Sequence, residues 1–295
     1  MKRITTLFLA CTFAVGTVLA QEDVKTAYYP TAGDYAVGIE ASPVLDFIGN
    51  MFNGTNNQAS DSRWDKSDYT LHGRYFLTDN SALRLHLRFN PNKFKTIERN
   101  FVTDDAAKTL NPLTTDKVED KKVTRKNDWR IAVGYQQFRG SSRFRGFYGG
   151  DLFYRYERTF NSYYYGNIMN EFNTAPTTTP AFSPAADRVL KSSTGGQHTV
   201  GAVGFTGVEF YYMKHACIGF EVGLVLQGTL ATRGWELKER MVGSLHEQFE
   251  AETTPPEASF HIGTNFGKDD RMGGSTGKAG LAGTGYGNFY LMFHF

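Results

Sequence analysis

The stretch SALRLHLRFN (residues 81–90) alternates apolar and polar side chains with a period of two. Its apolar positions are Leu83, Leu85, Leu87 and Phe89, and its polar positions include Arg84, His86 and Arg88. This alternation predicts a β-strand with one apolar and one polar face. In a soluble sandwich the leucines would face a core and the arginines water. In a transmembrane barrel the leucines would face lipid and the arginines an enclosed polar interior.

The N-terminal sequence MKRITTLFLACTFAVGTVLAQ (1–21) has the layout of a secretory signal peptide. Two basic residues are followed by an apolar stretch and by small residues ahead of an expected cleavage site after Ala20. The apolar stretch is too short for a membrane-spanning helix, and no later stretch approaches about 18 apolar residues. We therefore expect a signal peptide over 1–20 and a periplasmic tail over 21–32.

The cysteine content limits the covalent chemistry of the chain, which has 2 cysteines, Cys11 and Cys217. Cys11 also allows a lipoprotein interpretation, but cleavage there would leave an apolar N-terminus exposed. Once the signal peptide is removed, Cys217 remains alone. The sequence therefore predicts neither an intramolecular disulfide nor a cysteine-based metal site.

The composition favours strands and does not indicate a nucleic-acid partner. The 295 residues include 31 Gly, 24 Phe and 16 Tyr but only 9 Pro, which suits strands that curve and carry aromatic rings. Because 32 basic residues stand against 30 acidic ones, no charge excess points to nucleic acid. The mean hydropathy of −0.40 does not exclude a barrel, since only alternate strand residues face lipid.

Period-two segments recur along the chain and predict about eight strands, bounded mostly by turn-type residues. The segments are 33–49, 67–77, 82–90, 128–138, 146–160, 198–212, 217–235 and 283–295. The connections alternate between short turns and long loops, and the long ones are 50–66, 91–127, 161–197 and 236–282. Short periplasmic turns and long extracellular loops are typical of outer-membrane barrels. We therefore expect an all-β fold over 33–295, an eight-stranded antiparallel up-and-down transmembrane β-barrel in the outer membrane of a Gram-negative cell.

The two faces of the predicted strands differ in charge. The faces that include Val37, Phe220 and Phe293 carry no charged residue, as a lipid contact requires. The opposite faces hold Glu40, Asp46, His72, Arg74, Arg84, His86, Arg88, Arg130, Asp151, Arg155, Glu157, Glu209 and Glu221.

An eight-stranded barrel is just wide enough to be filled by side chains. Unpaired buried charges are costly, so we expect a structural charge network in the lumen. Its expected members are Glu40, Arg74, Arg84, Arg88, Arg130, Asp151, Arg155, Glu157, Glu209 and Glu221. In particular, we expect Arg84 or Arg88 to lie within salt-bridge distance of one of the interior carboxylates.

Aromatic residues gather near the ends of the predicted strands and predict two interfacial belts. One belt, toward the periplasm, comprises Tyr35, Tyr75, Tyr212, Phe293 and Phe295. The other, toward the exterior, comprises Phe47, Tyr69, Phe89, Trp129, Tyr154 and Tyr156. The general preference of aromatic residues for strands explains part of this pattern but not its clustering at strand ends.

The final strand FYLMFHF (289–295) resembles that of small outer-membrane β-barrels of the OmpA/OmpX-like kind. The resemblance implies insertion by the barrel-assembly machinery, which in that family reads an alternating last strand ending in an aromatic residue. Phe293 and Phe295 match this assembly signal, whereas Tyr290 stands where the family often has glycine. The stretch 33–54 also looks like the first strand of a group of uncharacterised Gram-negative surface barrels, which implies no activity.

Motifs for cofactors and metals are weak. GGSTGKA (273–279) misses the phosphate-loop motif at Met272 and Ala279, and we interpret it as a flexible glycine-rich loop. The 7 histidines are scattered, so no metal-ligand spacing is present. For His72 and His86 we expect hydrogen bonds to interior carboxylates rather than a metal. We predict no cofactor.

An enzyme in this membrane would need a histidine with a serine or a carboxylate at the rim of the barrel. His198 near Ser192 and Ser193, or His246 with Glu247 and Glu250, are the available groupings. No motif spacing supports either of them. We therefore predict no catalytic residues, while a hydrolase acting at the rim remains an alternative.

The leading functional hypothesis is a non-enzymatic outer-membrane barrel whose loops have a structural or surface-binding role. Expected partners are outer-membrane lipid, lipopolysaccharide and, during insertion, the barrel-assembly machinery. The extracellular ligand is not indicated. A small-solute channel is the alternative if ten or more strands are present, most plausibly through a missed pair in 236–282. There, LKERMVGSLHEQFE (237–250) fits either a short helix or an extension of the neighbouring strands.

Overall fold

The computed structural model describes residues 28–41, 69–89, 94–140, 143–182, 187–263 and 288–295. These residues form one antiparallel sheet of 13 strands and the short helix α3, Asp105–Leu110. The strands are β1 Tyr35–Glu40, β2 Tyr69–Thr78, β3 Ser81–Phe89, β4 Thr96–Thr103, β5 Lys117–Arg139, β6 Phe144–Tyr164, β7 Arg188–Ser193, β8 Gln197–Met213, β9 Ala216–Ala231, β10 Gly234–Val242, β11 Leu245–Thr253, β12 Ser259–Gly263 and β13 Asn288–His294.

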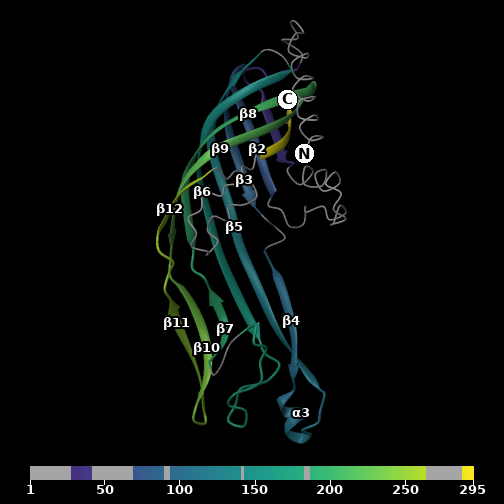
Figure 1. The fold of residues 1–295 in the computed structure, drawn as a ribbon, viewed down its shortest axis with the longest axis vertical. Coiled ribbons are helices and arrows are strands. Elements are labelled where there is room, and N and C mark those ends of the chain that lie inside the picture. The colour runs from purple at the N-terminus through teal and green to yellow at the C-terminus, as the bar shows by residue number, and fades with distance from the viewer. Residues whose placement is uncertain (1–27, 42–68, 90–93, 141–142, 183–186, 264–287) are drawn as a thin grey trace, which may run out of the picture.

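Eight of the strands pair in a continuous circuit, which we call the strand ring. Its order is β1, β2, β3, β5, β6, β8, β9 and β13, and every pairing is antiparallel. The last strand returns to the first, because Val37 of β1 lies opposite Phe293 of β13. The ring lies at one end of an elongated molecule (Figure 1).

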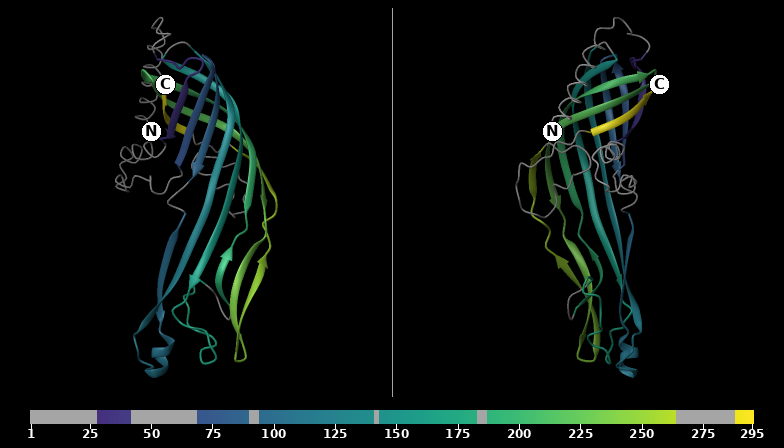
Figure 2. Two further views of the ribbon diagram at one scale, coloured as in Figure 1. Left: turned by 180° about the vertical axis from the view of Figure 1, so that it is seen from behind. Right: turned by 45° about the vertical axis from the view of Figure 1, so that its right-hand side comes forward.

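The short turns are all at one end of the ring. β2 and β3 are joined through Asp79 and Asn80, and β8 and β9 through Lys214 and His215. His215 has a φ of 66°, a left-handed conformation that a tight turn between strands requires. The long strands β5 and β6 extend from this end, form part of the ring and continue beyond its other end (Figure 2).

The remaining elements form a second region, which we call the distal half. It comprises β4, α3, β7, β10, β11, the outer parts of β5 and β6, and the loop 165–182. β4 pairs with β5, β7 with β6, and β10 with both β7 and β11, so this half extends the same sheet. Only β12 is placed differently, as an added partner of β9.

The segment SALRLHLRFN (81–90) has the predicted facing over the part that forms β3. β3 has Leu83, Leu85 and Leu87 exposed, while Arg84 and Arg88 are buried. β1 alternates in the same way, with Val37 and Ile39 outward and Ala36 and Glu40 inward. The predicted alternation is confirmed for these strands.

The prediction of an eight-stranded barrel is wrong in its strand count, because the sheet has 13 strands. Three of the predicted long loops contain strands: β4 and the first part of β5 in 91–127, β7 in 161–197, and β10 to β12 in 236–282. The outer part of β5 reads KVEDKKVTRKN, with polar residues on both faces. Such a strand has no apolar alternation by which the sequence could reveal it.

The hairpin of β10 and β11 decides between the two structures considered for 237–250. The segment forms two strands, and the turn between them contains Gly243 with a φ of 64°. Glycine suits this position because a left-handed conformation is strained for most other residues. The extension of neighbouring strands is therefore correct, and the short helix is wrong.

The tip of the distal half contains α3, the only helix among the described residues. Its N-terminus is capped by Asp104, whose side chain accepts hydrogen bonds from the backbone N–H groups of Ala106 and Ala107. No helix in the described part of the chain is long and apolar enough to cross a membrane.

Several sequence-based expectations fall outside the described residues. They are the signal peptide with its cleavage site at Ala20, the interior Asp46, the belt residue Phe47 and the GGSTGKA segment. The strand predicted over 33–49 is described only as far as Ala41.

Candidate functional site: the charged interior of the strand ring

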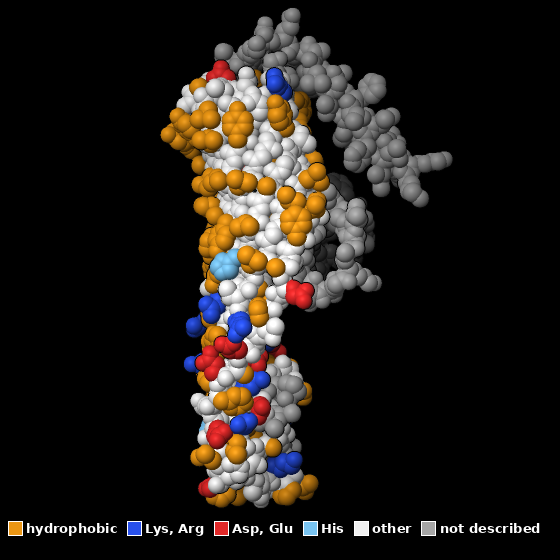
Figure 3. Space-filling model, turned by 90° about the vertical axis from the view of Figure 1, so that its left-hand side faces the viewer, with side chains coloured by type: hydrophobic (Ala, Val, Ile, Leu, Met, Phe, Trp, Pro, Cys, Tyr) orange, Lys and Arg blue, Asp and Glu red, His pale blue; other side chains and the backbone are white. Residues whose placement is uncertain are grey.

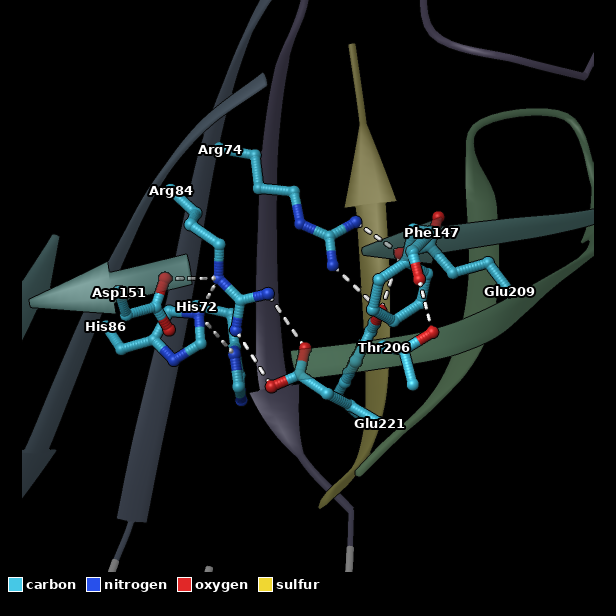
Figure 4. A network of polar contacts seen from close by, with 10 residues as sticks. His72, Arg74, Arg84, His86, Phe147, Asp151, Thr206, Glu209 and Glu221 are labelled. Atoms are coloured by element: carbon cyan, nitrogen blue, oxygen red, sulfur yellow. Dashed lines mark hydrogen bonds and ion pairs between the residues drawn. The ribbon is translucent and has the colours of Figure 1, made fainter. Parts of the chain in front are cut away.

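The inward faces of the ring strands bring together ionisable side chains that are far apart in the sequence. β2, β3, β6, β8 and β9 all contribute to one polar network (Figure 4). The fully or almost fully buried members are His72, Arg74, Arg84, Asp151, Glu209 and Glu221. Period-two alternation places each of them inward, while its neighbours along the strand face outward.

Arg84 lies at the centre of one half of this network. Its Nη1 and Nη2 atoms donate to the two carboxylate oxygens of Glu221, at 2.7 and 3.1 Å. Its Nε atom lies 3.2 Å from Oδ1 of Asp151. The guanidinium also lies 3.9 Å from the ring centroid of Phe205, a cation–π contact. Arg84 therefore has the ion pair that the sequence predicts for Arg84 or Arg88.

Arg74 and Glu209 form the other half of the network. Their ion pair joins Nη1 to Oε1, and both side chains are almost completely buried. Tyr290 connects the pair, since its hydroxyl accepts from Arg74 Nη2 at 2.8 Å and donates to Glu209 Oε1 at 2.6 Å. Tyr211 donates to the second Glu209 oxygen at 2.8 Å. Both carboxylate oxygens of Glu209 are thus hydrogen-bonded, as a buried charge requires.

The two interior histidines do not make the predicted hydrogen bonds to carboxylates. His72 Nδ1 lies 3.4 Å from His86 Nε2, and the rings meet edge to face. Arg84 Nε donates to the same His86 nitrogen at 2.9 Å. Asp151, Glu209 and Glu221 are already paired with arginine, whose fork of donors fits a carboxylate better than an imidazole does.

Three other predicted interior residues lie along the same lumen. Glu40 is buried and accepts a hydrogen bond from Thr70 Oγ1 at 2.7 Å. Arg130 stacks on Phe153, with its guanidinium 3.8 Å from the ring centroid. Arg88 is also buried, at 8% exposure. The sequence therefore places all three on the correct face of their strands.

A second charged cluster lies on the inward face where the ring passes into the distal half. Arg155 donates two hydrogen bonds of 2.9 Å to Asp128 and lies 3.0 Å from Glu157. Lys126 lies 2.8 Å from Glu157. Sequence reasoning identified Arg155 and Glu157 but missed Asp128, although Asp128 shares the strand parity of Arg130.

Arg145 was also missed, and it is 1% exposed. Its Nη2 atom donates to the backbone oxygen of Asp79 at 2.7 Å and to Asn80 Oδ1 at 3.0 Å. Arg145 pairs in register with Glu209, an inward residue of β8. That parity was available in the sequence, but the strand was predicted to begin only after Arg145.

The distal half has a buried polar cluster of its own. Arg188 lies 2.6 Å from Glu239 and donates to the backbone oxygen of Asn167 at 2.7 Å. Asp120 is completely buried and accepts hydrogen bonds from the backbone N–H groups of Gly166 and Thr179, at 3.0 and 2.8 Å. These contacts fix the loop 165–182 against β5 and β7, and Glu239 of β10 holds Arg188.

Asp105 fixes the same loop from the helix end. It accepts hydrogen bonds from Thr177 N at 2.7 Å and from Asn173 Nδ2 at 2.9 Å. Partial burial raises the pKa of the Asp105 carboxyl, but these hydrogen bonds and the charge of Lys108 outweigh it, so the pKa is lowered overall.

The structure does not assemble either of the considered catalytic groupings. His198 Nδ1 lies 2.7 Å from the hydroxyl of Tyr154, while Ser192 accepts from Asn161 and Ser193 from Arg158. His246 lies 2.9 Å from Glu239, which was not one of its expected partners.

No group of three or more histidine, cysteine, aspartate or glutamate side chains suited to a metal ion occurs in the described part of the chain. Cys217 is a buried free thiol. The chemistry of the interior is that of arginines held by carboxylates.

The outward face of the ring is apolar, whereas its inward face carries charged side chains. Hydrophobic side chains spread over the broad half of the molecule, and charged side chains gather on the narrow half (Figure 3). We call the outward hydrophobic residues of the ring the apolar band. Its exposed members include Tyr35, Val37, Ile39, Leu83, Leu85, Leu87, Ile131, Val133, Leu152, Val200, Phe220, Leu224, Leu226 and Leu230.

Aromatic side chains border the apolar band at both ends. At the short-turn end, the rings of Tyr35 and Tyr75 are 4.9 Å apart, and the assembly-signal residues Phe293 and Phe295 are exposed. At the other end Trp129 packs against Tyr154 and Tyr156, at ring distances of 5.4 and 6.1 Å. His198, which the sequence did not include in this belt, lies 5.1 Å from the Tyr156 ring.

The comparisons with known proteins add little to this geometry. No protein-family model matches the sequence, and no curated protein matches it. Among solved structures, the chain is similar to one titled "Crystal structure of the outer membrane protein OprG from Pseudomonas aeruginosa". The identity is 9%, the TM-score is 0.30, and the match covers 90% of this chain and 98% of that one. At this TM-score the likeness supports no statement about fold or function.

Proposed function

We propose that the chain is a non-enzymatic outer-membrane β-barrel protein whose strand ring spans the membrane and whose distal half projects from the cell. In this proposal the short turns face the periplasm, and the distal half has a structural or binding role outside. The proposal extends to the OmpA/OmpX-like small barrels, because Phe293 and Phe295 fit the assembly signal of that group.

The observation that carries the proposal is the inverted distribution of polarity in the ring. Arg84 and Glu221 are 3% and 0% exposed, whereas Leu83 and Leu152 are 48% and 66% exposed. A soluble monomer rarely exposes apolar patches larger than a few hundred square ångströms. In hydrocarbon the same arrangement is favourable, because every strand of the ring is paired on both sides and the charges are enclosed.

The filled interior favours a structural barrel over a channel. Arg74 from β2 reaches Glu209 on β8, and Arg84 from β3 reaches Glu221 on β9, so ion pairs cross the lumen. We predict no steady conductance when the purified protein is added to planar bilayers. Stable openings of porin size would show that these ion pairs do not block the lumen.

Purification with and without detergent tests the proposed function directly. The expected result is a protein that needs detergent, has a β-rich circular dichroism spectrum and migrates differently on gels before and after heating. A monomer that stays soluble without detergent would overturn the membrane assignment. A hydrolytic activity lost on changing His198→Ala or His246→Ala would overturn the non-enzymatic assignment.

The expected partners follow from this location. Outer-membrane lipid and lipopolysaccharide would contact the apolar band, and the barrel-assembly machinery would insert the ring. The extracellular ligand is not identified, and nothing in the charge of the chain favours nucleic acid.

A further inference from the structure

Three basic residues occupy the outward face immediately beyond the apolar band. They are Arg125 on β5, Arg158 on β6 and Lys191 on β7. Arg158 is the next outward residue after Tyr154 and Tyr156, since side chains on one face of a strand recur every second residue. The three residues therefore lie on the same side of the sheet as the lipid-facing residues of the ring.

The strand register gathers these three cations around one side chain, Phe160. Phe160 lies opposite Arg125 on one neighbouring strand and opposite Ser193 on the other. Lys191 is two residues from Ser193 on the same face. Residues at such opposite and diagonal positions lie within about 4.5 to 8 Å of each other.

Arg158 is held over the centre of this group. Its guanidinium lies 4.2 Å from the ring centroid of Phe160, and its Nε atom donates to Ser193 Oγ at 3.1 Å. These contacts use one donor and leave the Nη atoms for a ligand. We call Arg125, Arg158 and Lys191 the basic cluster.

The basic cluster has no carboxylate partner among the described residues, as is also true of Lys108, Lys117, Lys121 and Lys122. Among the described residues, the ion pairs of this half join Arg99 to Glu119, Lys126 and Arg155 to Asp128 and Glu157, Arg188 to Glu239, Arg233 to Glu252, Lys238 to Glu236 and Arg240 to Glu247. No ion pair involving the basic cluster occurs within the described ranges. The outward Glu250 lies two strands away from Lys191, on β11.

The level of the cluster suits a lipid headgroup. Trp129, Tyr156 and His198 border the apolar band directly below it, and aromatic belts of this kind mark the level of headgroups. In Figure 3, Lys and Arg side chains lie just beyond the apolar part of this face, and Asp and Glu side chains lie near and beyond them. A ligand that fits must have acyl chains along the band and an anion above them.

We propose that the basic cluster binds the phosphate groups of an outer-leaflet lipid, namely the diphosphorylated lipid A part of lipopolysaccharide. This inference rests on the proposed membrane-spanning ring. The acyl chains of the lipid lie along Leu152 and Val200 of the apolar band. The phosphates of the lipid accept hydrogen bonds from the two arginines and Lys191. Arginine can pair with phosphate through two parallel hydrogen bonds, so such a cluster suits this anion.

The test measures binding of diphosphoryl lipid A to the detergent-solubilised full chain, with the dephosphorylated lipid as a second titrant. The variant combines Arg125→Gln, Arg158→Gln and Lys191→Gln. We expect about 100-fold weaker binding of the phosphorylated lipid, because each cation near an anionic surface contributes roughly a fivefold factor. Binding of the dephosphorylated lipid is expected to remain unchanged.

The matched control removes the same charge at the short-turn end, where Arg139, Arg143 and Lys214 are exposed. Replacing these three residues with glutamine is expected to leave lipid A binding as in the parent. An equal loss in both variants, or no loss in the first, would overturn the site. Inorganic phosphate that competes as well as lipid A would overturn its assignment to a lipid.

Gel mobility before and after heating is recorded on every sample, which separates this inference from the proposed function. A heat-modifiable parent that binds lipid A independently of the basic cluster overturns only the site. A parent that is soluble without detergent overturns the membrane-spanning ring and the site together.

Discussion

The strand ring and the distal half bury charges in similar ways but differ in the charged groups that they expose. In the ring, Arg84 and Glu221 pair with side-chain exposures of 1% and 0%, and in the distal half Arg188 and Glu239 pair at 5% and 8%. Outside, the ring exposes Leu152 at 66%, whereas the distal half exposes the ion pair of Arg233 and Glu252 at 72% and 69%. The exterior therefore distinguishes the two regions, and the buried ion pairs do not.

The change of surface occurs within single strands. On the outward face of β5, Val133, Ile131 and Trp129 are followed by Asn127 and Arg125, without a shift in register against β6. A continuous backbone thus carries an apolar outward surface and then a polar one. The hydrogen-bonded sheet continues through both parts, and only the side chains differ.

The largest expected effect comes from breaking the central ion pair of the ring with Arg84→Met. Glu221 and Asp151 would then lose a shared partner in a closed interior. Removing one member of a buried pair typically costs about 3–5 kcal/mol, and partial hydration of the lumen would reduce this. We expect a clearly lower temperature for the gel shift from folded to heat-denatured protein.

Leu85→Met is the matched control, because Leu85 lies next to Arg84 but on the outward face, with 40% exposure. It is expected to leave the gel-shift temperature almost unchanged. If the two variants behave alike, the inward and outward assignment of β3 is wrong, and the contrast between the two regions fails in the ring.

The ring was predictable from the sequence because, in the proposed membrane location, two environments act on its strands at once. Lipid requires apolar residues at every second position, and the closed interior tolerates charge only in pairs. The alternation in SALRLHLRFN therefore predicts both the strand and the direction of each of its faces. The outer part of β5 faces polar surroundings on both sides, and its stretch KVEDKKVTRKN gives no such signal. Its strand structure depends on pairing with β4 and β6, which a local pattern does not encode.

The interior site was predictable by face but not by partner. Strand parity identifies Arg74, Arg84, Glu209 and Glu221 as inward residues, yet it does not determine that Arg74 meets Glu209 and Arg84 meets Glu221. That choice depends on which strands lie across the lumen. Tyr290 was considered only as a departure from a family pattern, although its hydroxyl links the Arg74–Glu209 pair.

A smaller effect is expected from the corresponding change in the distal half, Arg188→Met. Glu239 would lose its buried cation, and the loop 165–182 would lose the hydrogen bond to the Asn167 backbone. Because the ring does not contain these contacts, the loss is expected to act as local opening. We expect proteolysis within 165–182 to accelerate at least about tenfold, with the gel-shift temperature of the ring unchanged.

Lys191→Met is a suitable comparison, since Lys191 lies on the same strand but is exposed and has no ion pair within the described residues. Its proteolysis rate is expected to equal that of the parent. A lower gel-shift temperature in the Arg188 variant would mean that the two regions unfold as one unit, and the contrast between them would concern surfaces only.

The smallest expected effect is a pH dependence confined to the tip of the distal half. The Asp105 carboxylate accepts hydrogen bonds from Thr177 N and Asn173 Nδ2, and its pKa lies below the ordinary value of 3.8. A carboxyl with a lowered folded-state pKa contributes stability that is complete above its unfolded pKa and is lost as pH falls through the folded value. The loop 165–182 is therefore expected to stay ordered at pH 5 and to loosen only below about pH 4.

Hydrogen exchange at the Thr177 amide measures this loosening, after correction for the intrinsic effect of pH on exchange. In the parent, protection is expected to decline as pH falls below about 4, while amides of the ring stay protected. Asp105→Asn cannot ionise, so its Thr177 protection is expected to be lower at pH 5 and independent of pH. If the asparagine variant shows the same pH dependence as the parent, another group controls the loop, and the Asp105 carboxylate is not what fixes 165–182 to α3.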